Sequence, residues 1–110
     1  MIKTYNKLVR DNIPDIIKNN GEDQITRILT NEEYKQELEK RLYEEYQEVL
    51  ESSGKDRIEE LADMLEVIKS LAKLEDKCLE DIITAANQKN SKRGAFNDKI
   101  FLEKVITNNK

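Results

Sequence analysis

The chain has 110 residues and a formal net charge of −4, from 19 basic and 23 acidic side chains. Charged residues make up 38% of it, whereas an average globular domain has about 25%. The sequence contains no histidine, which excludes Ser-His and Cys-His dyads and imidazole metal ligands, and its single cysteine excludes an internal disulfide. An acidic balance with four tyrosines and two phenylalanines also argues against stable nucleic-acid binding. Because histidine is absent, any catalysis must rely on carboxylates.

The length predicts a single domain covering residues 1–110, and the helical patterns described below predict that it is all-α. No linker, repeat or low-complexity tract divides the chain, and no apolar run is long enough for a membrane span or a signal peptide. We expect a soluble cytoplasmic protein. Because hydrophobic residues reach only 37%, packing between protomers or a bound ligand should supply part of the stability.

The N-terminal quarter of the chain predicts three short elements. Residues 3–10 lack a helical period and should form an extended arm. Residues 11–20 predict a short helix, with Asp11 as its cap and Gly21 as its stop. The β-branched residues within 24–29 permit a short strand.

A long helix is predicted from Thr30 to Ser53. It begins with a capping box, in which Thr30 is followed three residues later by Glu33. Its buried stripe is formed by Tyr34, Leu38, Leu42 and Val49. Glu45 falls in the middle of this stripe and Glu48 at its edge.

The connection at residues 54–55 is so short that the next helix must run antiparallel to the first. This second helix should span residues 56–76, with Asp56 as its cap, and it should be central because apolar residues cover more than half of its circumference. A third helix should follow at residues 77–92. The tail at residues 96–106 is apolar enough that we expect it to pack. The predicted fold is a helical bundle built on an antiparallel hairpin.

Four carboxylates near the apolar stripes carry the chemistry: Glu45, Glu48, Glu60 and Asp63. A buried carboxylate is costly unless it is protonated, paired or bound to a metal. Residues three apart share a helix face, so the hairpin can bring the two pairs together. Oxygen ligands alone select hard cations, Mg²⁺ or Mn²⁺. The alternative for each pair is a solvated helix face, and we prefer that alternative for Glu44, Glu51, Glu59 and Glu66, although Glu44 and Glu59 could support the ligands from outside.

These residues resemble a known family. Residues 44–48 and 59–63 resemble the EExxE…ExxD signature of the all-α nucleoside triphosphate pyrophosphohydrolases, the MazG-like enzymes. Residues 5–14 look like the opening "YNKLVRDKIP" of a phosphoribosyl-ATP pyrophosphohydrolase-like branch, and residues 92–96 with 100–102 look like its "RGGF…IFL" ending. Nearly the whole chain is covered, with Ala95 departing from the second glycine of that ending.

The resemblance implies Mg²⁺-dependent cleavage between the α and β phosphates of a nucleoside triphosphate, giving the monophosphate and pyrophosphate. Glu45, Glu48, Glu60 and Asp63 would bind the metal, and either Glu45 or Glu48 would accept a proton from the attacking water. Cations for the phosphates are available at Lys7, Arg10, Lys89, Lys92 and Arg93. Asn6 could orient the sugar or base. For any single lysine, ordinary surface charge is the stronger interpretation, whereas both arginines lie inside matched motifs.

Assembly and rival functions complete the expectations. The apolar surface of the central helix predicts a homodimer or homotetramer. One rival function is a non-enzymatic helical interaction module, whose carboxylates would pair with basic residues of a partner. The other is the narrower activity on phosphoribosyl-ATP in histidine biosynthesis, as opposed to house-cleaning of nucleotides.

Overall fold

In the computed structural model, which describes residues 1–108, the chain divides into two compact units, residues 1–79 and a second unit that begins at residue 80. The helices of this described part are α1 (Ile13–Asn19), α2 (Asn31–Glu51), α3 (Gly54–Leu74) and α4 (Leu79–Arg93). None of them is both long enough and apolar enough to cross a membrane. Because the described residues form helices and no strand, the all-α prediction is confirmed for them, and the prediction of a strand at residues 24–29 is wrong.

The missing strand has a physical explanation. Ile25 and Ile28 are almost fully exposed, and a strand needs a partner to receive its backbone hydrogen bonds. Local β propensity without a neighbouring strand does not form a sheet. The segment instead connects α1 to α2, and Gln24 Nε2 donates a hydrogen bond to the carbonyl of Pro14 over 2.6 Å.

Helix α1 begins later than expected because Asn12, and not Asp11, is its N-cap residue, and the Asn12 side chain makes no capping hydrogen bond. Its end follows the prediction. Gly21 has a φ of 80°, and its N–H donates to the carbonyl of Lys18 while the N–H of Glu22 donates to Ile17. These two bonds form a Schellman motif, for which glycine is the favoured residue.

The capping box of α2 is confirmed in full. The hydroxyl of Thr30 accepts the N–H of Glu33 over 3.2 Å, and the Glu33 carboxylate accepts the N–H of Thr30 over 3.0 Å. Arg27 also donates to Glu33 over 2.9 Å. These three contacts lower the pKa of Glu33 to about 2, with the Arg27 hydrogen bond as the largest cause.

The turn between α2 and α3 differs from the prediction. Ser53 is the N-cap of α3, and its carbonyl already accepts the N–H of Arg57 over 3.3 Å. Helical bonding therefore starts before Asp56, which lies in the first turn, where its charge suits the helix dipole. Helix α3 ends at Leu74 because Asp76 takes a left-handed conformation with a φ of 58°.

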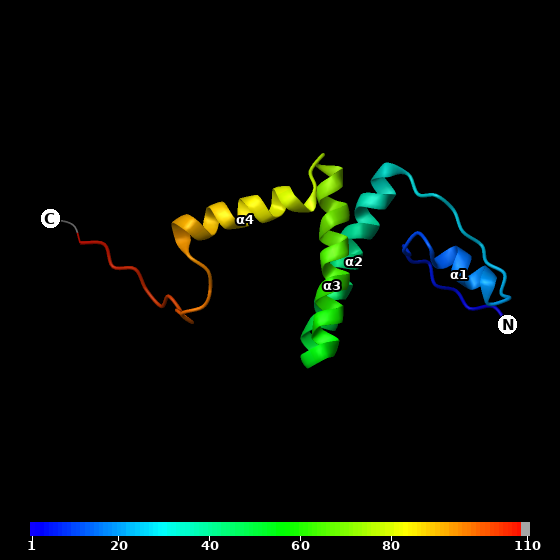
Figure 1. Ribbon diagram of the computed structural model, residues 1–110, viewed down its shortest axis with the longest axis horizontal. Coiled ribbons are helices and arrows are strands. Elements are labelled where there is room, and N and C mark those ends of the chain that lie inside the picture. The colour runs from blue at the N-terminus through cyan, green and yellow to red at the C-terminus, as the bar shows by residue number, and fades with distance from the viewer. Residues whose placement is uncertain (109–110) are drawn as a thin grey trace. The chain divides into compact units, whose positions relative to one another are not determined.

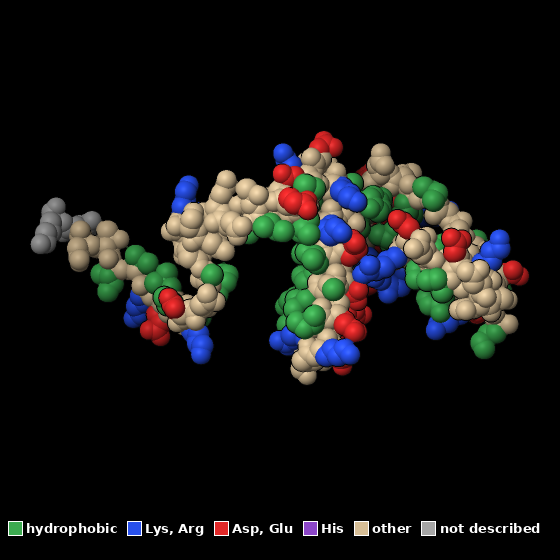
Figure 2. All heavy atoms as spheres, in the orientation of Figure 1, with side chains coloured by type: hydrophobic (Ala, Val, Ile, Leu, Met, Phe, Trp, Pro, Cys, Tyr) green, Lys and Arg blue, Asp and Glu red, His purple; other side chains and the backbone are tan. Residues whose placement is uncertain are grey.

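Helices α2 and α3 lie side by side as an antiparallel hairpin (Figure 1) and are the only pair of helices in contact among the described residues. Their interface contains the buried side chains Leu38, Glu45, Val67 and Ala72. A second apolar face of α3, which includes Ile58 and Leu61, is more open, and Ile58 is 66% exposed. Figure 2 shows hydrophobic side chains along one edge of α3 and acidic ones along the other.

Two further expectations concern the C-terminal unit. Helix α4 starts at Leu79 and ends at Arg93, close to the predicted bounds, and Gly94 follows with a φ of 78°. Within the C-terminal unit the described part of the tail is exposed, since Phe96 and Phe101 are 98% and 87% exposed, and its packing against another surface stays a prediction. High hydrophobicity predicts a need for burial, but it does not supply the surface that meets the need.

The capping box provides a test of the hairpin's stability. We expect Thr30→Ala to lower the free energy of unfolding by about 1 kcal/mol, because the N–H of Glu33 loses its acceptor. Urea denaturation followed by circular dichroism at pH 7 measures the change. Thr26→Ala, at an exposed position outside the helix, is the control and should be neutral. Equal losses in the two variants would contradict the role of Thr30.

Candidate functional site

The site is built on the hairpin by a symmetric spacing around its turn. Glu48 and Glu60 lie six residues before and after Gly54, and Glu45 and Asp63 lie nine residues before and after it. In an antiparallel pair of helices, positions equally far from the turn lie opposite each other. Gly54 is the first residue of α3, directly after the turn at residues 52–53, so each carboxylate of α2 lies near the height of the α3 carboxylates along the hairpin.

Three of the four predicted carboxylates lie together in the structure. Glu45, Glu60 and Asp63 each offer an oxygen, and these three oxygens all lie within 4.8 Å of one another. Glu48, at an exposed position on α2, lies close enough to Glu45 and Glu60 to raise the pKa of both carboxyls. The four residues named as metal ligands thus form one acidic cluster, with Glu48 at its edge and outside the group of three.

Glu45 is the most constrained member of the acidic cluster. Its side chain lies between α2 and α3, and the residue is only 3% exposed. One of its oxygens, Oε1, forms an ion pair with Nη2 of Arg41 at a distance of 2.9 Å. Arg41 lies one turn earlier in α2. The other, Oε2, is buried and accepts no hydrogen bond from any described N–H or O–H group, and the same holds for Glu60 Oε2. A buried carboxylate oxygen without a hydrogen-bond donor is costly, so a proton or a cation that reached either oxygen would relieve that cost.

Two carboxyl groups of the acidic cluster, those of Glu45 and Glu60, have raised pKa values. Burial is the main reason that the pKa of Glu45 lies above its ordinary value, and a hydrogen bond and charge repulsion with Glu48 add to the effect against the pull of Arg41. The pKa of Glu60 is raised to about 7, first by its hydrogen bond with Glu48 and then by loss of solvent and repulsion from the other carboxylates. Two carboxylates can hydrogen-bond only when they share a proton.

Two arginines balance part of this charge. Arg41 holds Glu45, and Arg10, from the N-terminal arm (residues 1–12), donates to Asp63 Oδ1 over 2.7 Å. With all four carboxylates ionised, two negative charges remain beyond the two guanidinium partners, which is the charge that one divalent cation neutralises. Without a metal, the proton held by the cluster replaces part of that charge. The donor set contains oxygen alone, which fits Mg²⁺ or Mn²⁺.

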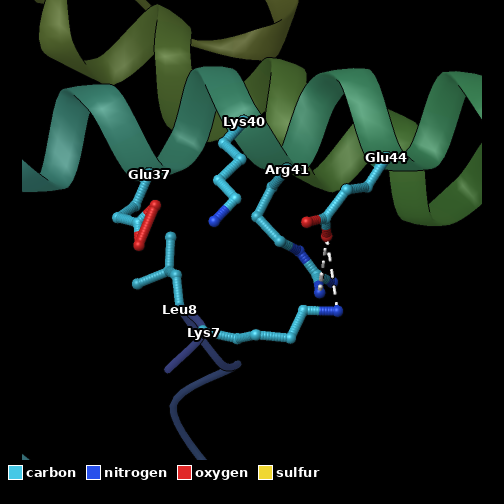
Figure 3. Close-up of a pocket in the computed structure, with 6 residues that line it drawn as sticks. All are labelled: Lys7, Leu8, Glu37, Lys40, Arg41 and Glu44. Carbon is cyan, nitrogen blue, oxygen red and sulfur yellow. Dashed lines mark ion pairs between the residues drawn. The ribbon is translucent and has the colours of Figure 1, made fainter. Parts of the chain in front are cut away.

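Arg41 was missed by the sequence analysis, although a signal for it exists. An arginine four residues before a glutamate lies on the same helix face, and this one precedes the glutamate at the centre of the buried stripe. Glu44, expected to support the ligands from outside, contacts Arg41 over 3.9 Å and Lys7 over 3.3 Å. Figure 3 shows Lys7 and Arg41 both reaching the Glu44 carboxylate. Glu44 therefore shares Arg41 with Glu45.

The remaining predicted residues fall into two groups. Asn6, Lys7 and Arg10 lie on the N-terminal arm, where Asn6 has a left-handed φ of 46° and the two cations pair with carboxylates of the hairpin. Lys89, Lys92 and Arg93 lie in the second half of α4, in the C-terminal unit. The role of Lys89, Lys92 and Arg93 in binding phosphate stays a prediction.

An open groove of about 420 Å³ lies next to the acidic cluster, at the turn end of the hairpin. Its lining consists of Glu48, Glu51, Ser52, Asp56, Glu59 and Glu60. Five of these six side chains are carboxylates, so the groove repels anions unless cations enter it. Glu59, the second residue expected to act from outside, is exposed and lines this groove beside Glu60.

The raised pKa values predict a pH dependence of stability without metal. The folded pKa of Glu60, about 7, exceeds its ordinary value of 4.5, so the folded protein keeps a proton that the unfolded chain releases. This contribution to stability is complete below pH 4.5 and is lost as the pH rises through 7. In EDTA, we expect the melting temperature to fall between pH 5 and 8, and to fall less in Glu60→Gln. Parallel melting curves for the two proteins would contradict the shifted pKa.

Comparison of the chain with protein-family models, curated proteins and solved structures finds no match. Membership of the MazG-like family therefore stays a prediction from the sequence motifs. The geometry of the acidic cluster is a separate observation, obtained from the fold.

Proposed function

We propose that this protein is a Mg²⁺-dependent nucleoside triphosphate pyrophosphohydrolase of the MazG-like type. The observation that carries the proposal is the approach of oxygens from Glu45, Glu60 and Asp63 to within 4.8 Å of one another around a buried carboxylate. A solvated acidic helix face, the rival explanation, has no reason to bury Glu45 or to leave its Oε2 without a hydrogen-bond donor.

In this proposal Glu45, Glu60 and Asp63 hold the divalent ion, with Glu48 completing the set. When bound, the ion neutralises phosphate charge and polarises the α-phosphorus. Five carboxylates line the groove beside the cluster and repel a polyphosphate, so a bound cation is needed before such a substrate can enter. Mn²⁺ should substitute, since both ions prefer oxygen ligands in octahedral geometry.

Glu48 is the general base in this proposal. Glu45 is buried and already paired with Arg41, whereas Glu48 is exposed and lines the groove from which water enters. The water oxygen would bond to the α-phosphorus, its proton would pass to Glu48, and pyrophosphate would leave with the electron pair of the broken bond. No histidine is present to do this work.

Positive groups must also contact the leaving pyrophosphate. Lys7 and Arg10 are the candidates nearest to the acidic cluster, because they already pair with Glu44 and Asp63. Arginine can bind phosphate through two parallel hydrogen bonds. The proposed phosphate contacts of Lys89, Lys92 and Arg93, which lie in α4, rest on the sequence motif alone. Asn6 remains the candidate for orienting the sugar or base.

The direct test is a panel of nucleoside triphosphates and phosphoribosyl-ATP incubated with Mg²⁺, with pyrophosphate and orthophosphate measured separately. We expect pyrophosphate and a nucleoside monophosphate, no product in EDTA, and a loss of at least about 100-fold in kcat for Glu48→Gln if it supplies general-base catalysis. Glu66→Gln, on the same hairpin but outside the cluster, should retain activity. Orthophosphate as the first product would refute the proposed bond cleavage, and a strict preference for phosphoribosyl-ATP would select the biosynthetic alternative.

The interaction module has one observation in its favour. Arg41 and Arg10 already pair with Glu45 and Asp63, so basic groups can satisfy these carboxylates as a partner's side chains would. This function predicts no hydrolysis and the same melting temperature in EDTA as in Mg²⁺. A metal site predicts a higher melting temperature in Mg²⁺, because the ion binds the folded state.

We also propose that the chain acts as a homodimer or homotetramer. Only Leu38, Val67 and Ala72 are buried hydrophobic residues among those described, while Ile58 and Leu61 on α3 are exposed. Three buried hydrophobic side chains are too few to stabilise a chain of this length. A second copy can cover the open face of α3 with the same face of its own.

Size-exclusion chromatography with light scattering tests this assembly at micromolar concentration. We expect at least twice the chain mass of 12.9 kDa. Ile58→Glu, which places a charge on the open face of α3, should shift the protein toward the monomer, whereas Glu39→Gln should not. A stable wild-type monomer would contradict the proposal.

A further inference from the structure

The N-terminal arm is held against both helices of the hairpin by ion pairs. Lys7 Nζ lies 3.3 Å from Glu44 Oε2 on α2, and Arg10 Nη2 lies 2.7 Å from Asp63 Oδ1 on α3. Between them Leu8 is half-buried and faces α2 near Glu37, as the close-up shows (Figure 3). The arm is therefore attached at two points, and the two points differ in their relation to the acidic cluster.

Only the Arg10 contact involves the acidic cluster itself. Asp63 is one of the three residues whose oxygens lie within 4.8 Å of one another, whereas Glu44 is outside that group. A second observation shows that the cluster is built for a positive species: Glu45 is 3% exposed, and its Oε2 has no hydrogen-bond partner. The Arg10 guanidinium thus lies on the same carboxylate that a divalent ion would need.

We propose that Arg10 and the divalent ion compete for Asp63, so that ion binding releases this part of the arm and the arm in turn weakens ion binding. The inference depends on the metal site of the proposed function. Two cations on one carboxylate repel each other, and the Arg10–Asp63 pair is weak enough to yield because both side chains are about half exposed. The released guanidinium then becomes available to an anionic substrate, while Lys7 stays on Glu44.

The competition is measured by titrating Mn²⁺ into the full-length chain by isothermal titration calorimetry. We expect Arg10→Gln to bind Mn²⁺ about three- to tenfold more tightly than the wild type, because the ion no longer displaces or repels a guanidinium. The matched control is Arg27→Gln. Arg27 forms an exposed pair of similar length with Glu33, 2.9 Å, at the start of α2 and away from the acidic cluster, so its loss should leave the affinity unchanged.

Hydrogen–deuterium exchange of the wild-type protein gives a second measurement that needs no variant. The N–H of Ile13 donates to the carbonyl of Arg10 over 3.0 Å, so this turn is ordered while Arg10 is held. We expect amides at residues 9–13 to exchange faster in saturating Mn²⁺ than in EDTA. Amides within α2 should exchange more slowly, because the ion stabilises the hairpin.

The possible results separate this inference from the proposed function. If the wild type binds Mn²⁺ and Arg10→Gln binds it equally or more weakly, or if the arm exchanges more slowly with Mn²⁺, competition is refuted while the metal site stands. If neither protein binds Mn²⁺ at millimolar concentration, both proposals fail. Binding by Arg10→Gln alone would support competition in its strongest form.

Discussion

The burial of one carboxylate, that of Glu45, is the constraint on which the rest of the hairpin depends. The side chain occupies a position in the α2–α3 interface that an apolar residue would otherwise fill. An ionised group there must be neutralised, and three kinds of positive charge can do it: the guanidinium of Arg41, a proton shared with Glu48, or a metal ion. The fold supplies the first, and pH and cation concentration decide between the others.

This constraint connects stability to chemistry. A sequence selected only for a stable hairpin would have leucine at this position, because replacing buried ionic groups by apolar ones is often neutral or stabilising. The retained carboxylate, with Glu60 and Asp63 facing it, makes the hairpin less stable but able to bind a cation. Few apolar residues are buried in the hairpin, so its stability is small and the cost of burying a carboxylate is a large part of it.

Helical periodicity was sufficient to predict the hairpin and the convergence of its carboxylates. Period and capping residues are local properties, so α2 and the face of α3 that carries Val67 could be derived from spacing alone. The strand at residues 24–29 and the packed tail could not be judged in this way, because each depends on a surface elsewhere in the molecule. The N-cap of α3 was misplaced because Asp56 is a good cap by type, whereas backbone bonding had already begun at Ser53.

The candidate site was predicted less completely than the fold. The sequence identified the carboxylates and named Arg10 as a ligand for phosphate, but it gave no indication that Arg10 contacts Asp63, 53 positions further along the chain. Such a pair depends on how the arm folds back, which no local pattern encodes. Arg41 follows the i and i+4 rule with Glu45, so this pair is encoded locally, unlike the Arg10–Asp63 pair.

The symmetric placement of the four carboxylates about Gly54 has an evolutionary consequence. One residue added to α3 between the turn and Glu60 turns the rest of that helix by about 100° relative to α2. Both α3 carboxylates would then leave the interface together, although helix content and overall composition would hardly change. Homologous hairpins should therefore conserve the length of this loop and of both helix arms up to the acidic residues more strictly than they conserve the residues in between.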